Sequence, residues 1–280
     1  NGPLNLEHAL EDIELDATAL APANDNIPLR YKLMREWQQA EAILDRKRLP
    51  SLYFFGITPE EYRAMKQRYL GLVTMVDQSI GGILSCLEQA ALLDETIVVH
   101  TSDHGDMLGA HHLFGKEVMF EEAVCVPYLV RLPSQRQSLS IAHPVSHIDF
   151  LPTLLNLLGE PKPDQCAGKS LVPLLHGEAM LPETIFMEWS PNRVKVMKGT
   201  KLAPRRAIKR AMNESTRALI SPEGWKLCLR DQDLNELYNL QTDPIEAHNL
   251  YYQDDYRAII ERATPDILSW QQATGDALKL

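Results

Sequence analysis

The feature that most constrains the fold is a change of hydrophobic period between residues 58 and 102. Residues 62–87 keep their apolar side chains on one helical stripe, and Thr58 with Pro59 forms a typical helix start. We therefore predict a helix from Thr58 to about Leu92. The β-branched run Thr96–Ser102 follows and predicts a buried parallel strand.

Two later segments extend this pattern. The runs Val126–Leu132 and Thr184–Trp189 predict further strands, and between them Asp149 begins a helix that Gly159 ends. Strands that alternate with helices are typical of α/β proteins with parallel sheets. The first two thirds of the chain therefore predict an α/β layer around a mainly parallel sheet.

The character of the chain changes after about residue 190. Arg217–Ile220 and Trp225–Leu229 flank the turn sequence Ser221–Gly224, which predicts an antiparallel hairpin. Glu236–Leu240 is a candidate for a further strand of the same small sheet.

The chain closes with a predicted helix from about Asp254 to Ala273, interrupted or kinked at Pro265. We accordingly divide the chain into two parts. Residues 1–190 form the α/β part, and residues 191–280 form a basic connecting segment with a small α+β subdomain.

Acidic residues outnumber basic ones, with 38 Asp and Glu against 28 Lys and Arg and a net charge of −10. Such a chain is not expected to bind nucleic acid or an anionic membrane through its overall field. No stretch approaches about 18 uninterrupted apolar residues, so we predict no membrane-spanning helix. One segment of this acidic chain is basic: Arg193–Arg217 contains nine basic residues and one acid. It is either a rim that attracts an anionic substrate or, as we favour, a solvated surface.

The cysteines are scattered and form no Cys-x-x-Cys motif, so we expect no disulfide framework. Cys86 and Cys125 fit small buried thiols beside a helix and a strand. This pattern leaves the compartment open, and a periplasmic, secreted or cytoplasmic protein is equally compatible with it.

The densest group of chemically active residue types is Thr101–Lys116, directly after the first predicted strand. Asp103 and His104 lie at the carboxyl end of that strand, where α/β sheets form ligand crevices. A carboxylate and an imidazole make half of a divalent-cation site, although the same pattern also occurs in capping turns. Glycines at positions 105, 109 and 115 allow a compact loop that returns Lys116 to the crevice, where it would hold an anionic oxygen.

Four ordered motifs resemble the second half of the sulfatase family, within the alkaline-phosphatase-like superfamily. The motifs are Tyr69–Gly81, Thr101–Lys116 with the following Phe120–Pro127, Ser146–Leu155, and Glu236–Leu250. The resemblance implies a three-layer sandwich around a mainly parallel sheet over residues 1–190, with its N-terminal part missing. It also implies a small C-terminal antiparallel sheet with a helix.

The resemblance also implies roles for individual residues. Asp103 and His104 correspond to two metal ligands, and Lys116 corresponds to a residue that contacts the sulfate or phosphate group. His111 matches a recurrent histidine of the loop, for which packing or support of the site is more expected than direct catalysis. Ca²⁺ is the expected metal, with Mn²⁺ and Mg²⁺ as alternatives.

The family's nucleophile is absent from this sequence. It is a formylglycine made from the Cys or Ser of a Cys/Ser-x-Pro-x-Arg motif. The nearest match is Cys125-Val126-Pro127-Tyr128-Leu129, which carries Leu129 in place of Arg and follows the metal loop. We therefore expect these 280 residues to be a carboxyl-terminal half that is inactive alone. The formylglycine is expected in an N-terminal half that was lost, cleaved or not included.

The resemblance implies a sulfuric ester hydrolase whose substrate is an anionic small-molecule or glycan sulfate ester. A phosphonate monoester or phosphodiester hydrolase of the same superfamily is the first alternative, because an Asp-His metal pair suits it equally. A non-catalytic remnant or binding module is the second. The N-terminal half is the expected protein partner, and an oligomer is possible.

Overall fold

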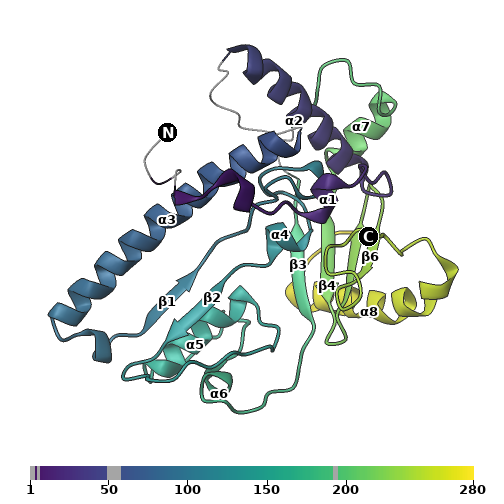
Figure 1. The fold of residues 1–280 in the computed structure, drawn as a ribbon. Helices are drawn as coiled ribbons and strands as arrows, with labels where there is room; N and C mark the ends of the chain where they lie inside the picture. The colour runs from purple at the N-terminus through teal and green to yellow at the C-terminus, as the bar shows by residue number, and fades with distance from the viewer. Residues whose placement is uncertain (1–3, 5–6, 49–57, 192–194) are drawn as a thin grey trace.

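The computed structural model describes residues 4, 7–48, 58–191 and 195–280 (Figure 1). In chain order the helices and strands are α1 (Ala17–Leu20), α2 (Leu29–Arg48), α3 (Pro59–Gln89), β1 (Val98–Thr101), α4 (Glu121–Val124), β2 (Tyr128–Arg131), α5 (Phe150–Leu157), α6 (Val172–Leu175), β3 (Ile185–Trp189), α7 (Arg205–Ala211), β4 (Thr216–Ile220), β5 (Trp225–Arg230), β6 (Glu236–Asn239) and α8 (Arg257–Thr274).

The long helix α3 begins as the sequence predicts. The Glu61 amide donates to the Thr58 hydroxyl at 3.3 Å, and the Thr58 amide donates to the Glu61 carboxylate at 3.1 Å. This reciprocal pair is a capping box, which satisfies two backbone donors at the helix start. The apolar stripe is present, but much of it faces solvent. Val76 is 48% exposed and Ile83 is 62% exposed.

Within the described residues, α3 is long and apolar enough to cross a membrane. The prediction of no membrane-spanning helix rested on uninterrupted apolar runs, and charged residues such as Asp77 do interrupt this one, so it stays a prediction. Length and composition alone are weak evidence for a span, since the core helix of a soluble fold meets the same criteria.

The strand predicted before the candidate metal loop is β1, and its partner is β2. Their register pairs Val99 with Val130 and Thr101 with Tyr128, in antiparallel orientation. Parallel pairing was therefore wrong for these two strands. The connection formed by residues 102–127 folds over the carboxyl end of β1 and re-enters the sheet from that end, so β2 runs in the opposite direction (Figure 1).

The second sheet has the order β3-β4-β5-β6, and all of its ladders are antiparallel. The predicted hairpin is confirmed, with Gly224 at φ +79° closing the turn between β4 and β5. The further strand predicted near Glu236 is also present as β6. Strand β3 had been expected in a parallel sheet, but it pairs with β4 along its whole length, so the antiparallel sheet begins before residue 190.

Helix α8 covers the second sheet. Ala263 and Ile267 share an apolar cluster with Leu219 and Leu227 of the hairpin. Pro265 lies inside the helix and does not end it. The chain therefore has the predicted combination of an α/β part with a small antiparallel sheet and a C-terminal helix.

The main hydrophobic core includes apolar side chains of the loop that follows β1. Tyr31 of α2, Met107 and Leu113 of the loop, Phe120 and Tyr238 of β6 belong to one buried cluster. This packing holds the loop between a helix and the second sheet, and so fixes the residues at its two ends.

Candidate metal and anion site

Asp103 and His104 leave the carboxyl end of β1 together. The Asp103 carboxylate lies 3.3 Å from Nε2 of His104 and also accepts the His104 backbone amide at 3.0 Å. Its side chain is 81% exposed, so the pair borders solvent. Partial desolvation opposes ionisation, but the hydrogen bond from the His104 backbone amide and the nearby Lys116 ammonium stabilise the carboxylate, so the pKa of Asp103 lies below its ordinary value.

The hydrogen bonds of His104 define which ring nitrogen is free to bind a cation. Nδ1 lies 2.7 Å from the Gly105 carbonyl oxygen, which only accepts, so Nδ1 carries the proton. The lone pair of Nε2 then points toward the Asp103 carboxylate and the Lys116 ammonium. An imidazole fixed in this tautomer is a suitable metal ligand.

Lys116 returns to the same point through a closed loop. The Asp106 carboxylate accepts hydrogen bonds from the amides of Leu108 at 2.9 Å and Gly115 at 3.2 Å. The Met107 amide also donates to the Gly115 carbonyl at 2.8 Å. The Lys116 ammonium thereby contacts Nε2 of His104. The structure thus brings together Asp103, His104 and Lys116, as the sequence predicts.

The position of the Lys116 ammonium shows that the space beside His104 and Asp103 accommodates a positive charge. The ammonium lies against the His104 lone pair, next to the Asp103 carboxylate. A divalent metal needs the same two donors, so the pair suits one. Among the described residues, no group of three or more His, Cys, Asp or Glu surrounds a common point. Two ligands are fewer than a tight divalent-cation site needs.

Gly105 lets the chain turn tightly behind His104. A Cβ atom at this position would lie 2.0 Å from the Glu122 carbonyl oxygen, and the Gly105 amide donates to the Ala123 carbonyl at 2.9 Å. Glycine is thus required by close backbone approach to α4.

Helix α4 is anchored in turn by a buried cation. The Lys226 ammonium is fully buried and lies 2.8 Å from both the Glu121 and Glu246 carboxylates. Burial opposes the charge, but the two carboxylates raise the pKa of Lys226. Glu246 also accepts the Glu121 backbone amide at 2.6 Å. No local sequence pattern indicated this cluster, because Glu121 is more than 100 positions from Lys226 and Glu246.

Arg30 supports the other end of the loop. It is 2% exposed, donates a hydrogen bond to the Glu117 carbonyl, and lies 3.7 Å from the Glu214 carboxylate. Glu117 has φ +82°, a left-handed conformation that is uncommon for this residue type. The contact with Arg30 therefore stabilises an unfavourable turn directly after Lys116.

His111 has a packing position. Its ring stacks on Phe120 with centroids 3.8 Å apart, and its backbone amide donates to the Thr18 hydroxyl at 2.8 Å. Burial lowers the pKa of His111 to about 4, so the ring is neutral near pH 7. This arrangement favours support of the loop over direct catalysis.

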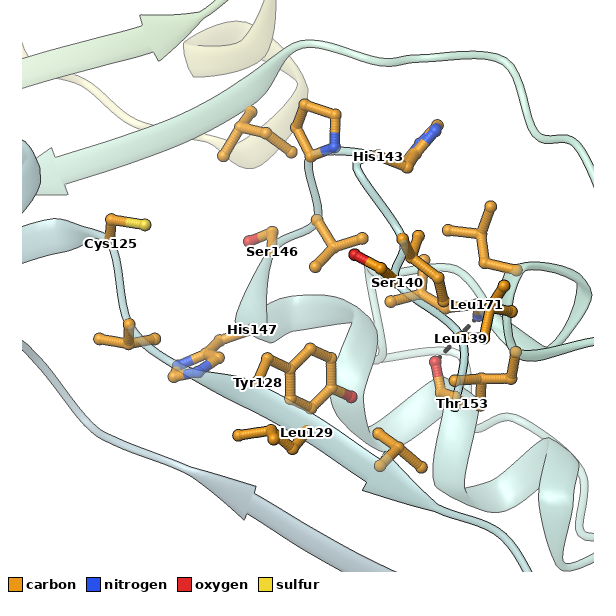
Figure 2. Close-up of a pocket in the computed structure, with 18 of the residues that line it drawn as sticks. Cys125, Tyr128, Leu129, Leu139, Ser140, His143, Ser146, His147, Thr153 and Leu171 are labelled. Atoms are coloured by element: carbon orange, nitrogen blue, oxygen red, sulfur yellow. Dashed lines mark hydrogen bonds between the residues drawn. The ribbon is translucent and has the colours of Figure 1, made fainter. Parts of the chain in front are cut away.

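A cavity of about 1020 Å³ opens beside the site, with Asp103 in its lining. Figure 2 shows Tyr128, Ser146 and His147 near the end that also holds Cys125. Nε2 of His147 lies 2.9 Å from the Thr101 hydroxyl, which joins the histidine to the end of β1.

Cys125 is exposed, so the interpretation of this thiol as a core residue was wrong. It is the C-cap of α4, where the chain leaves the core and borders the cavity. Cys86 on α3 is likewise exposed, so the expectation of a buried thiol was also wrong at this position. All four cysteines are free thiols.

Comparisons with known proteins find similarity to the same family that the sequence motifs resemble. The family model described as Sulfatase matches residues 43–160. An N-acetylglucosamine-6-O-sulfatase from Bacteroides thetaiotaomicron is 31% identical over 199 residues, which make up 70% of this chain and 34% of that protein.

Two solved structures are similar to almost the whole chain. A phosphonate monoester hydrolase from Silicibacter pomeroyi matches with a TM-score of 0.77 and 23% identity, over 98% of this chain and 53% of that one. The corresponding enzyme of Agrobacterium radiobacter gives 0.71 and 25%, over 97% and 53%. The chain spans about a third of the curated relative and about half of each structure, and it shares their fold over that part.

Proposed function

Because this chain belongs to the sulfatase family, we propose that it supplies the metal- and anion-binding part of a sulfuric ester hydrolase. The observation that carries the proposal is the convergence of Asp103, His104 and Lys116 at the carboxyl end of β1. A carboxylate, a neutral imidazole and an ammonium are the groups needed to hold a cation beside a sulfate ester.

Each residue has a distinct part in this proposal. Asp103 neutralises part of the charge of a divalent cation, and Nε2 of His104 donates a lone pair to it. Lys116 moves from the imidazole to an oxygen of the bound sulfate and stabilises the negative charge that grows there in the transition state. The cation, expected to be Ca²⁺ with Mn²⁺ or Mg²⁺ as alternatives, polarises the sulfate oxygens when bound.

The nucleophile belongs to residues outside this sequence. We propose that it is a formylglycine, and that the further metal ligands come from the same additional part of the protein. The proposal is supported by the chain's coverage of about half of the similar hydrolase structures. Exposed apolar side chains on α3 and β2, such as Ile83 at 62% and Leu129 at 58%, are then the surfaces that the additional part covers.

The substrate class that we propose is a sulfate ester of a small molecule or a glycan. This choice follows the sulfatase family match and the relative named as a sulfatase of N-acetylglucosamine. A phosphonate monoester or phosphodiester is the second candidate, since the structural match at 25% identity is to a phosphonate monoester hydrolase.

The test is expression of the complete coding frame and comparison of aryl sulfate with aryl phosphonate turnover under identical conditions. Faster turnover of the sulfate supports the proposal, and dominant phosphonate turnover supports the second candidate. Absence of both activities together with absence of divalent-cation binding would indicate a remnant or binding module. Lys116→Ala should reduce turnover of the preferred ester by about 100-fold, while Lys279→Ala, an exposed lysine near the C-terminus, should leave it unchanged.

A further inference from the structure

The segment from Lys195 to Arg210 is strongly basic in an otherwise acidic chain. It contains seven basic residues and no acidic one, and every basic side chain in it is exposed. We call this set the cationic face, formed by Lys195, Lys198, Lys201, Arg205, Arg206, Lys209 and Arg210. Two members of the longer basic run are not part of it. Arg193 lies outside the described residues, and Arg217 is buried with its guanidinium 2.6 Å from Asp276.

The cationic face has no carboxylate partners among the described residues. Two exposed arginines elsewhere in the chain do have such partners. Arg136 pairs with Asp94 at 2.7 Å, and Arg257 pairs with Glu261 at 3.0 Å. In the cationic face, the Lys195 ammonium lies 5.0 Å from the centre of the Trp37 ring, a contact with an aromatic face. The surface thus gathers positive charge without neutralising it.

The local sequence of α7 does not need these charges in order to fold. Arg205 with Lys209, and Arg206 with Arg210, place like charges at i and i+4 on one helix face, where they repel. Two arginines in the first turn also oppose the helix dipole, whereas Lys209 and Arg210 in the last turn favour it, and Pro204 at the N-cap gives no side-chain hydrogen bond. The repelling pairs contribute nothing to the local stability of α7, and their combined positive charge favours an anionic ligand.

The cationic face is linked to the candidate site through buried contacts. Helix α7 lies beside α2 (Figure 1) and ends at Ala211, three residues before Glu214. The Glu214 carboxylate lies 3.7 Å from Arg30, and Arg30 holds the Glu117 carbonyl next to Lys116. A ligand bound along α7 is therefore attached to the same framework that positions the anion-binding lysine.

We propose that the cationic face binds a sulfated polysaccharide and holds it beside the candidate site. The inference rests on the proposed function, because a hydrolase of glycan sulfate esters needs to retain a polyanionic chain. Regularly spaced sulfates release bound counterions when they meet an array of lysines and arginines, which makes the binding strong at low salt. The segment itself contains no aromatic residue, and the Trp37 ring beside it lies under the Lys195 ammonium, so the surface fits a glycan better than single-stranded nucleic acid, whose bases need open aromatic rings for stacking.

The test measures binding of this chain to heparin, to desulfated heparin and to a single-stranded DNA of similar length, over a series of NaCl concentrations. The variant Arg206→Gln/Lys209→Gln/Arg210→Gln removes three charges from the cationic face. The control Arg257→Gln/Arg262→Gln/Lys279→Gln removes three exposed charges elsewhere, so both variants have the same net charge.

We expect heparin binding to weaken at least about 10-fold in the first variant, with a smaller salt dependence, and to change less than about 2-fold in the control. Desulfated heparin should bind weakly to every form. Equal losses in the two variants, equal binding of desulfated heparin, or tighter binding of DNA would each overturn the proposal. Ester turnover does not enter this measurement, so failure of the proposed hydrolase activity is detected separately.

Discussion

Arg30 in the first turn of α2 donates a hydrogen bond to the backbone carbonyl of Glu117, 87 positions later in the chain. Glu117 has the positive φ that turns the chain directly after Lys116. The position of the candidate anion-binding lysine therefore depends on a buried cation from a different element, as well as on the glycines of its own loop.

Replacing Arg30 by Met should lower the free energy of unfolding by about 3 to 5 kcal/mol. The substitution removes a hydrogen-bond donor from the Glu117 carbonyl and one of the two cations near the buried Glu214 carboxylate. Urea unfolding of the chain measures the change.

Arg257→Met is the matched control, because its ion pair with Glu261 lies on an exposed helix face. Its cost should stay below about 0.5 kcal/mol. Similar losses in the two variants would contradict a special role for Arg30.

The loop between β1 and α4 could be predicted from sequence because its determinants are local. A strand, an adjacent carboxylate and imidazole, and spaced glycines together predict that Lys116 returns to Asp103 and His104. The supports of the loop could not be predicted in this way. Arg30, and Lys226 with Glu121 and Glu246, are brought together by the tertiary fold, and no short-range pattern marks such pairs.

The predicted parallel pairing of the strands was wrong for a different reason. The β-branched runs correctly predicted β1, β2 and β3, but apolar character does not distinguish parallel from antiparallel neighbours. The stripe on α3 likewise predicted an apolar helix face, and periodicity does not show whether another element covers that face within the same chain.

Gly105→Ala should displace the backbone behind His104. The new methyl group would meet the Glu122 carbonyl at 2.0 Å, and both atoms belong to rigid backbone segments. We expect a loss of at least about 2 kcal/mol in unfolding free energy. Gly82→Ala is the control, since nothing lies within 4 Å of its Cβ and alanine favours the helix by up to about 1 kcal/mol. A stable Gly105→Ala variant would show that α4 moves freely and would contradict this packing argument.

Lys116 should compete with a divalent cation in this chain. Its ammonium lies at Nε2 of His104 beside the Asp103 carboxylate, so a bound cation must displace it or be repelled by it. Lys116→Met should therefore tighten Mn²⁺ binding by about 10-fold, as measured by calorimetric titration. Asp103→Asn should weaken binding, and Lys279→Met should leave it unchanged. Weaker binding in Lys116→Met would indicate that the lysine organises the ligands instead of competing with the metal.

The stability of the chain should fall with acidification in a way that depends on His111. The unfolded chain protonates this residue near pH 6.5, whereas burial lowers its pKa to about 4 in the folded state. Between these values the unfolded state binds more protons, so the unfolding free energy decreases as the pH falls. The full effect below pH 4 is about 3 kcal/mol.

His111→Asn isolates this contribution. Asparagine tolerates the left-handed backbone at φ +53° and carries no titrating ring, although it loses the stacking contact with Phe120. The variant should be less stable near pH 7, yet lose less stability than the wild type between pH 6.5 and pH 4. Because Glu246 and other titrating groups are common to both proteins, the difference between the two urea-unfolding profiles reports the histidine alone. Parallel profiles over this pH range would mean that His111 protonates as easily in the folded chain as in the unfolded one.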